Sequence, residues 1–398
     1  MGLEYSVHDW PRRGSFEGCL GILAAPVRVG VSIRGSTVIS SGRAAIRNGK
    51  FMEDSDVPTA ADRLVELVER GDHESAVGGV AALETAATDE RKAALRSLRT
   101  LAESTPEAVS PLVESLSPFL TDEERAVRLS TAKLFVAVAE GDPDATVPAV
   151  SALASRLGDD EEFYYVRARA AEALGYVAVE RPDEVASPEV LADLRVGLAF
   201  DESEVREKLA KALECVALGD PSRLRHRVPA LAEHLTDERE LVRYHLTTAL
   251  VAVGCEHPDR LRQARDEIRE RLDDESAPVR GRAVEALGLA ARADSDETMA
   301  EGALPDPDDA DPFVAERVRF AARADGAAAA TDGEPATGDG DADSDPRVGT
   351  LASVRETTEA VAADIASGGG EAECSSCGLG LPADGPPMCP RCGAPREF

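Results

Sequence analysis

Residues 166–182 of the chain, VRARAAEALGYVAVERP, contain the pattern that decides the fold. A Val-Arg pair opens the stretch, Leu174 follows the arginine by seven residues, and Pro182 follows it by fifteen. Apolar residues also occupy the third and fourth positions after the arginine. Offsets of 3, 4 and 7 lie on one face of an α-helix, so the stretch predicts an amphipathic helix that packs against other helices.

A repeat of 37 to 39 residues runs through the middle of the chain. Successive Val-Arg pairs place their arginines, called anchor arginines below, 39, 39, 37 and 37 residues apart. Arg91 lies 37 residues before Arg128 and anchors a further unit that lacks the valine. A second apolar segment precedes each anchor arginine, and short acidic turns such as Thr236-Asp237-Glu238 separate the two. The sequence therefore predicts an all-α protein with about six two-helix repeats.

This pattern resembles the HEAT-repeat family, in particular the short HEAT-like variant known from phycobilin-lyase-type proteins. The resemblance covers residues 74–293, and a further helix near 59–70 is predicted to cap the N-terminal end. Two helices per unit cannot bury their apolar faces alone, so the resemblance implies that the units stack into a curved α-solenoid. The second helices of the units would line its concave face.

The anchor arginines occupy the same helical phase in every unit. In HEAT families the turn aspartate and this arginine form a ladder between neighbouring units, so the resemblance implies a structural role for them. The predicted ladder consists of Arg128, Arg167, Arg206, Arg243 and Arg280. We do not count these residues as ligand contacts.

Basic residues gather on the second helices at positions that lie off the buried face. Only four lysines follow Met52, and all four lie on second helices. In a chain with a net charge of −31, this favours a positive stripe that binds an acidic segment of a protein partner. The candidate partner-binding residues are Arg96, Lys133, Arg169, Lys208, Lys211, His245, Arg282, Tyr164 and Tyr165. The alternative is that these cations neutralise acidic groups within the molecule.

Two Cys-x-x-Cys-Gly motifs, separated by 11 residues, lie close to the end of the chain. Cys374, Cys377, Cys389 and Cys392 supply four thiolates, which is the donor set of a closed tetrahedral zinc site. Both motifs look like the knuckles of a zinc ribbon, so we expect one structural zinc ion that drives the folding of this small segment. Iron in a rubredoxin-like site is the main alternative, because the ligands alone cannot exclude it.

The composition divides the chain into segments. Residues 1–51 carry seven basic and three acidic residues and the only tryptophan, whereas strongly acidic sequence begins after Met52. We interpret 1–51 as an extension upstream of the true start, and a targeting peptide is the alternative because Arg12-Arg13 loosely resembles a twin-arginine signal. The other predicted segments are the solenoid with its cap helix at 52–293, a degenerate terminal repeat at 294–325, a disordered acidic linker at 326–346, a short amphipathic helix at 347–368 and the zinc ribbon at 371–398. The short helix is either a solvated stalk or a docking or dimerising helix.

The acidic surface limits the function. Phosphate contacts need cations, so general binding to nucleic acids or anionic membranes is not expected. The chain has 75 acidic residues and only five lysines, a balance that suits a salt-rich cytoplasm and predicts a halophilic archaeal source. No apolar run is long enough to cross a membrane.

HEAT-like enzymes provide three tests, and the sequence meets none of them. Deoxyhypusine-hydroxylase-like proteins bind iron through several His-Glu pairs, whereas this chain has one, His73-Glu74. HEAT-like DNA glycosylases use aromatic residues in a basic concave groove, whereas no tryptophan follows Trp10. Phycobilin lyases share the repeat, but nothing in the sequence indicates a bilin pocket. We therefore expect no enzymatic activity, and a lyase-type enzyme is the third interpretation.

The favoured interpretation is a cytoplasmic scaffold or adaptor that binds a protein partner on the concave face. The runner-up is a nucleic-acid- or transcription-associated accessory protein that acts through the zinc ribbon, a module that often serves there. The sequence indicates neither the identity of the partner nor the oligomeric state.

Overall fold

The computed structural model describes residues 59–293, 304, 306, 310–329, 348–368, 372–373 and 380–381. These residues belong to one compact unit, Asp56–Phe398. Their regular structure is helical except for two short strands, which confirms the predicted all-α class. No helix among them is long and apolar enough to cross a membrane. The predicted extension at 1–51 lies outside the described residues.

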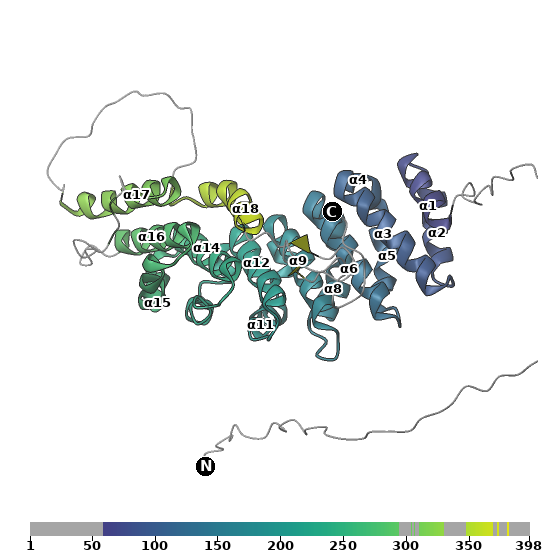
Figure 1. Ribbon diagram of the computed structural model, residues 1–398, viewed down its shortest axis with the longest axis horizontal. Helices are drawn as coiled ribbons and strands as arrows, with labels where there is room; N and C mark the ends of the chain where they lie inside the picture. Colours follow the sequence, from purple (N-terminus) through teal and green to yellow (C-terminus); the bar gives the residue numbers. More distant parts are fainter. Residues whose placement is uncertain are drawn as a thin grey trace, which may run out of the picture. The chain divides into compact units, whose positions relative to one another are not determined.

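Long helices form one layer and stack in the order of the sequence (Figure 1). They are α3 (Thr88–Ser104), α6 (Arg125–Gly141), α9 (Tyr164–Glu180), α12 (Ser203–Gly219), α14 (Glu240–Glu256), α16 (Ala277–Arg292) and α17 (Pro312–Ala329). The valines of the anchor pairs are fully buried in the interior of this stack. The first six of these helices are the predicted second helices, and the surface that they present away from the other layer is called the second-helix face below.

The first helix of each repeat is shorter and more broken than the sequence pattern indicates. This layer contains α1 (Ala60–Glu69), α2 (His73–Leu83), α4 (Pro106–Val109), α5 (Val113–Leu116), α7 (Pro143–Thr146), α8 (Val150–Leu157), α10 (Pro182–Val185), α11 (Pro188–Gly197), α13 (Val228–Ala232) and α15 (Arg265–Glu270). Turns of 3₁₀ helix connect them at Ser110–Leu112, Ser117–Thr121, Val147–Ala149, Pro221–Arg223, Pro258–Ala264 and Arg271–Asp273. Prolines such as Pro111 and Pro148 lie inside these turns, where the missing N–H prevents a continuous α-helix.

The two ends of the stack contain helices where the sequence predicts a cap helix near 59–70 and a terminal repeat at 294–325. Thr59 is the N-cap of α1, and its side chain and that of Asp62 form a capping box that satisfies the N-terminal end of this helix. Helix α17 packs against α16. It extends to Ala329, so the boundary predicted at 325 for the start of a linker is too early.

Small residues allow the second helices to approach one another closely. A Cβ atom added at Gly219 on α12 would lie 2.0 Å from the carbonyl oxygen of Ala178 on α9. The core between the layers consists mainly of Ala, Val and Leu side chains, in agreement with the low aromatic content. The interior is therefore a set of thin layers rather than one large aromatic core.

Two further elements follow the stack. Helix α18 (Leu351–Gly368) packs on α14 and α12, and its Val354 is fully buried. Strands β1 (Ala372–Glu373) and β2 (Gly380–Leu381) pair antiparallel on either side of the first Cys-x-x-Cys motif. The four cysteines of the predicted zinc ribbon and most of the predicted acidic linker lie outside the described residues.

Candidate partner-binding face

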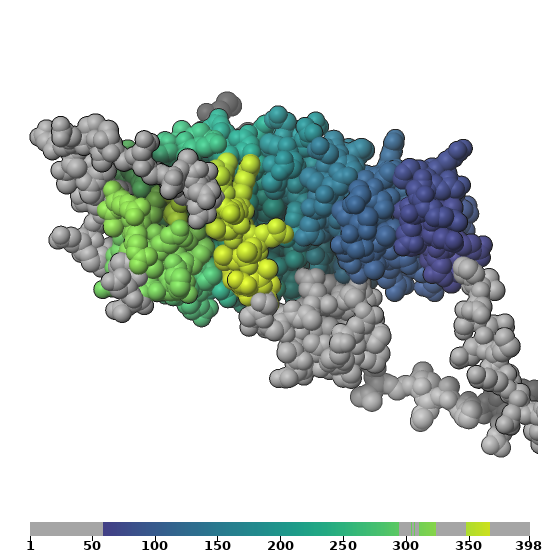
Figure 2. Space-filling model, turned by 90° about the horizontal axis from the view of Figure 1, so that it is seen from above, coloured from purple at the N-terminus to yellow at the C-terminus, as the bar shows by residue number. Residues whose placement is uncertain are grey.

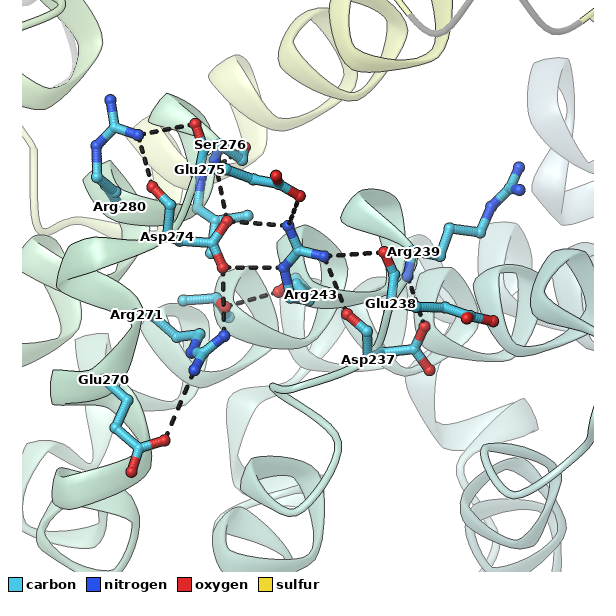
Figure 3. Close-up of polar contacts among 12 residues, drawn as sticks. Asp237, Glu238, Arg239, Arg243, Glu270, Arg271, Asp274, Glu275, Ser276 and Arg280 are labelled. Atoms are coloured by element: carbon cyan, nitrogen blue, oxygen red, sulfur yellow. Dashed lines mark hydrogen bonds and ion pairs between the residues drawn. The ribbon is translucent and has the colours of Figure 1, made fainter.

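Arg243 on α14 shows how an anchor arginine joins two consecutive repeats (Figure 3). Its Nη1 donates to the backbone oxygens of Asp237 and Glu238 in its own turn, at 2.9 and 3.1 Å. Its Nε and Nη2 donate to the two carboxylate oxygens of Asp274 in the next turn, at 2.9 and 3.0 Å. Asp274 also accepts from the backbone N–H of Ser276 at 3.0 Å, at the start of α16. One guanidinium therefore fixes two turns relative to each other.

Three other anchor arginines make the same kind of contact. Each donates to backbone oxygens of its own turn and pairs with a carboxylate of the next turn. The pairs are Arg91–Asp122 at 3.0 Å, Arg128–Glu162 at 2.6 Å and Arg206–Asp237 at 2.6 Å. The contact thus recurs between repeats, which is the arrangement of a ladder.

Arg167 and Arg280 depart from this arrangement. Arg167 donates to the backbone oxygen of Leu157 at 2.8 Å, and its guanidinium lies 4.9 Å from the ring centre of Phe200 in the next repeat. Arg280 donates to the backbone oxygens of Asp274 and Glu275 at 2.6 and 2.9 Å. The residues that directly follow its helix lie outside the described part of the chain, so its contact with a following turn is undefined.

A buried carboxylate surrounded by cations lies on the second-helix face between α9 and α12. Glu172, which is 5% exposed, pairs with Arg169 at 2.6 Å, with Lys208 at 3.3 Å and with Lys211 at 3.8 Å. Burial alone would raise the pKa of Glu172, but the charges of Lys208, Arg169 and Lys211 lower it below its ordinary value. Three of the predicted partner-binding cations are therefore bound to one glutamate of the same molecule.

Two further glutamates continue this pattern toward α16. Glu207 pairs with Arg239 and with Lys208, and Glu214 pairs with Nδ1 of His245. His245 and Glu214 are 3% and 1% exposed. The second-helix face thus contains alternating cations and carboxylates rather than cations alone.

The most deeply buried charges lie under the junction of α16, α17 and α18. Glu285 accepts from Arg282 at 2.8 Å, from Arg317 at 3.0 Å and from the backbone N–H of Gly349 at 3.0 Å. Arg282 and Glu285 have no exposed surface. Burial would raise the pKa of Glu285, but the charges of Arg282 and Arg317 lower it.

These contacts correct the prediction of an open positive stripe. Arg169, His245, Arg282 and Tyr165 are more than nine-tenths buried, so they offer almost no surface to a partner in this conformation. The physical reason is that Arg169, His245 and Arg282 pair with glutamates of the same and neighbouring helices, that α18 contacts Arg282, and that Tyr165 packs into the core. Accessible surface remains on five of the nine candidates, which are Arg96, Lys133, Tyr164, Lys208 and Lys211.

Helix α18 lies on the second-helix face beside α17 (Figure 2). Arg282 donates through Nη2 to the hydroxyls of Thr357 and Thr358, at 2.9 and 3.1 Å. The hydroxyl of Tyr244 on α14 donates to the backbone oxygen of Thr358 at 3.4 Å. Arg355 donates through Nε to the backbone oxygen of Leu218, at the C-terminal end of α12, at 2.8 Å. The predicted amphipathic helix is therefore docked on the solenoid, and a solvated stalk is the wrong alternative for its first half.

A cavity of about 560 Å³ remains between α18 and helices α9, α12 and α14. Tyr176, Lys211, Glu214 and His245 line one side, and residues of α18 from Arg355 to Ala366 line the other. Within the described part of the chain, Oε1 of Glu214 has no hydrogen-bond partner. The groove under α18 is therefore incompletely filled.

Three adjacent aromatic residues lie at the lengthened turn before α9. The rings of Phe163 and Tyr164 lie 4.6 Å apart, and those of Phe163 and Tyr165 lie 5.4 Å apart. The guanidinium of Arg125 lies 4.5 Å from the ring centre of Phe163. Tyr165 packs inward, whereas Tyr164 keeps part of its surface accessible.

Sequence reasoning left open whether acidic groups of the molecule neutralise the cations, and it did not identify the glutamates that pair with them or the contacts of α18. The glutamates had a detectable signal, because Arg169–Glu172 and Arg282–Glu285 are spaced by three residues on a helix, a spacing that brings opposite charges together. Arg355 and Thr358 had no such signal, because their partners lie more than 70 residues away along the chain. Among the described residues, no group of three or more His, Cys, Asp or Glu side chains is arranged to hold a metal ion.

Comparisons with known proteins agree with this architecture. Residues 150–250 match the family model for HEAT repeats. An engineered protein of known structure is similar with a TM-score of 0.50 and 21% identity, over 68% of this chain and 74% of that chain. A designed armadillo repeat protein in complex with the peptide (KR)4 is similar with a TM-score of 0.49 and 19% identity, over 53% of this chain and 97% of that chain. No curated protein matches the sequence. The chain thus has a repeat-solenoid fold, and its residues 150–250 are similar to HEAT repeats.

Proposed function

We propose that the protein is a non-catalytic, cytoplasmic scaffold that binds a protein partner on its second-helix face. The observation that carries this proposal is the continuous stack of second helices, held in a fixed order by contacts between consecutive turns. Such a stack presents one extended surface, and repeat solenoids typically use this surface for protein interaction. The fold by itself implies no chemistry, so the function is assigned to the surface.

The accessible part of this face over α3 and α6 supports an acidic partner segment. Arg96 is exposed, and Lys133 and Tyr164 are half-buried. Lys208 and Lys211 are committed to Glu172 and are better regarded as structural cations. The proposed contact surface is therefore centred on Arg96, Lys133 and Tyr164, nearer the N-terminal end than the predicted stripe as a whole.

We also propose that Cys374, Cys377, Cys389 and Cys392 bind one structural zinc ion. Four cysteines leave no open coordination position for catalysis, which favours a structural role. The antiparallel pair of β1 and β2 supports a hairpin around the first Cys-x-x-Cys motif.

Charge reversal tests the proposed surface. Wild-type protein, the double variant Arg96→Glu/Lys133→Glu and the control Arg195→Glu are used to isolate partners from native lysate. Arg195 is exposed on α11, in the other layer, so its reversal changes charge without touching the second-helix face. We expect a protein that the wild type and the control retain, and whose affinity for the double variant falls more than tenfold. Equal retention by all three proteins would refute this surface.

Salt dependence provides a second measurement on the same complex. If Arg96 and Lys133 contact an acidic segment, raising the ionic strength should weaken wild-type binding, because salt screens exposed charges. The double variant should show a smaller dependence on salt than the control. Circular dichroism of all three proteins checks that the helical content is unchanged.

A further inference from the structure

Part of the surface beneath α18 is polar, although it lies under a docked helix. Arg282, Glu285 and Arg317 form a charged cluster there, and the hydroxyl of Tyr244 points to the backbone of α18. Charged groups are hydrated again when a covering helix leaves. Exposing an apolar surface to water would instead cost free energy. The part of this surface formed by Tyr244 on α14 and by Arg282 and Glu285 on α16 is therefore compatible with solvent when α18 is absent.

Helix α18 itself has few apolar contacts with the solenoid. Among its described side chains, only Ser353, Val354 and Thr358 are buried, and all three belong to its first half. By contrast, α14 buries side chains from Val242 to Gly254. Few buried apolar contacts correspond to a low free energy of local opening. Docking of α18 depends on a small number of hydrogen bonds made by Arg355, Thr357 and Thr358.

The second half of α18 does not fill the groove that it covers. Ala362 and Ala366 follow Thr358 at intervals of four residues, so they lie on the same side of the helix, and both line the cavity of about 560 Å³. Larger apolar side chains at these two positions would occupy that space. The groove therefore fits a helix with bulkier residues better than it fits α18.

We propose that the groove over α9, α12 and α14, together with Arg282 on α16, is a binding site for an amphipathic helix of a partner protein, and that α18 occupies it in cis until the partner displaces it. The partner helix would present an arginine to the end of α12, hydroxyl groups to Arg282, and large apolar residues where α18 has Ala362 and Ala366. This inference rests on the proposed role of the second-helix face, but it concerns a different part of that face.

Hydrogen exchange of the full chain tests the occupancy by α18. Amides of α18 should exchange faster than those of α14 in the wild type. Arg355→Ala removes the contact with α12 and should speed exchange in α18 by about tenfold, the effect of losing one charged hydrogen bond. Ala362→Leu/Ala366→Leu should slow exchange in α18 by at least about tenfold, because the new side chains fill the cavity. The control Ala360→Leu, at an exposed position outside the cavity lining, should leave exchange unchanged.

A labelled peptide with the sequence of residues 348–368 tests the groove directly. It should bind the full-length variant Val354→Asp/Arg355→Ala, in which α18 is released, and bind the wild type at least tenfold more weakly. A peptide that carries leucine at positions 362 and 366 should bind more tightly than the natural sequence. These measurements do not use the partner of α3 and α6, so they can fail while the proposed function holds.

Three results would overturn the inference. The first is exchange in α18 as slow as in α14, which would make α18 a permanent part of the fold. The second is the absence of peptide binding to the released variant. The third is a concentration-dependent dimer of the released variant, which would assign the groove to α18 of a second copy rather than to a different protein.

Discussion

Replacing Arg243 with alanine should destabilise the junction between α14 and α16. The substitution removes both bonds to the carboxylate of Asp274 and both bonds to backbone oxygens of the preceding turn. The two paired side chains are only 6% and 2% exposed, so the remaining carboxylate stays in a poorly solvated position. Breaking a buried pair typically costs 3–5 kcal/mol. Because Asp274 keeps its contacts with Ser276 and Arg271, we expect the lower end, about 3 kcal/mol.

Arg181→Ala is a matched control. Arg181 also joins two consecutive repeats through a two-bond contact, in this case with Asp144, at 2.5 and 2.9 Å. The paired side chains are 54% and 59% exposed, so water replaces the lost contact. We expect no resolvable change in stability from this variant. The comparison separates the effect of burial from that of pair geometry.

Equilibrium unfolding in urea, combined with hydrogen exchange, measures the effect. Solenoids can unfold in parts, so exchange in α14 and α16 reports the local loss more directly than one global midpoint. The Arg243→Ala variant should exchange faster mainly in these two helices. A loss below about 1 kcal/mol, the level of an exposed ion pair, would refute the view that the ladder is a buried structural contact. Arg243→Lys should recover only part of the stability, because an ammonium group cannot reproduce the planar fork of donors.

Three further predictions concern acid, metal and helix spacing. The pKa values of Glu172 and Glu285 lie below their ordinary value of 4.5, so the stability that they contribute is complete above about pH 4.5 and is lost as the pH falls. Thermal unfolding between pH 7 and pH 3 should show this loss, and a Glu285→Gln variant with the same pH dependence as the wild type would contradict it. Elemental analysis after a chelator wash should find one zinc ion per chain, and Cys389→Ser should remove it without changing the helical content; stoichiometric iron, or two disulfides without metal, would contradict the zinc assignment. Gly219→Ala should lower the melting temperature, because the added Cβ would lie 2.0 Å from the carbonyl oxygen of Ala178, and an unchanged melting temperature would mean that α9 and α12 can separate at no cost.

The repeated pattern predicts the layers because it depends on local periodicity. Offsets of 3, 4 and 7 from each anchor arginine define the buried face of each second helix without knowledge of its neighbours. The ladder contacts could be predicted by the same reasoning, because a fixed helical phase places each anchor arginine at the same edge of its repeat. The broken first helices were less predictable, because prolines inside them permit either a kink or short 3₁₀ turns.

The charges of the second-helix face could not be assigned in the same way. Whether Lys208 faces solvent or Glu172 depends on how far α12 is displaced along α9. This displacement is set by the packing between the two helices and cannot be derived from the sequence of either helix alone. The docking site of α18 could not be predicted from the sequence for a similar reason. Its hydrogen bonds are made by a few polar residues whose partners are distant in sequence, and such contacts leave no periodic signal.

The composition of the core explains why the ladder is built from arginine. Where α9 meets α12, the contacting residues are small, and a Cβ atom added at Gly175 would lie 2.9 Å from the Cα atom of Ala212. Small side chains form shallow ridges, so packing alone weakly opposes sliding of one helix along the next. At this junction Arg167 supplies a directional contact through the backbone oxygen of Leu157 and the ring of Phe200. At the junctions of Arg128, Arg206 and Arg243, a guanidinium that binds two backbone oxygens and one carboxylate supplies it.

The spacing of the ladder pairs supports this role. Arginine and aspartate are 31 residues apart in the pairs Arg206–Asp237 and Arg243–Asp274, but Arg128 pairs with Glu162, 34 residues away, at the lengthened turn. There the longer glutamate side chain restores a two-bond contact, at 2.6 and 2.9 Å, although the path of the chain differs. At this turn the contact is thus kept although the spacing changes, which is expected if its geometry fixes the position of one repeat on the next.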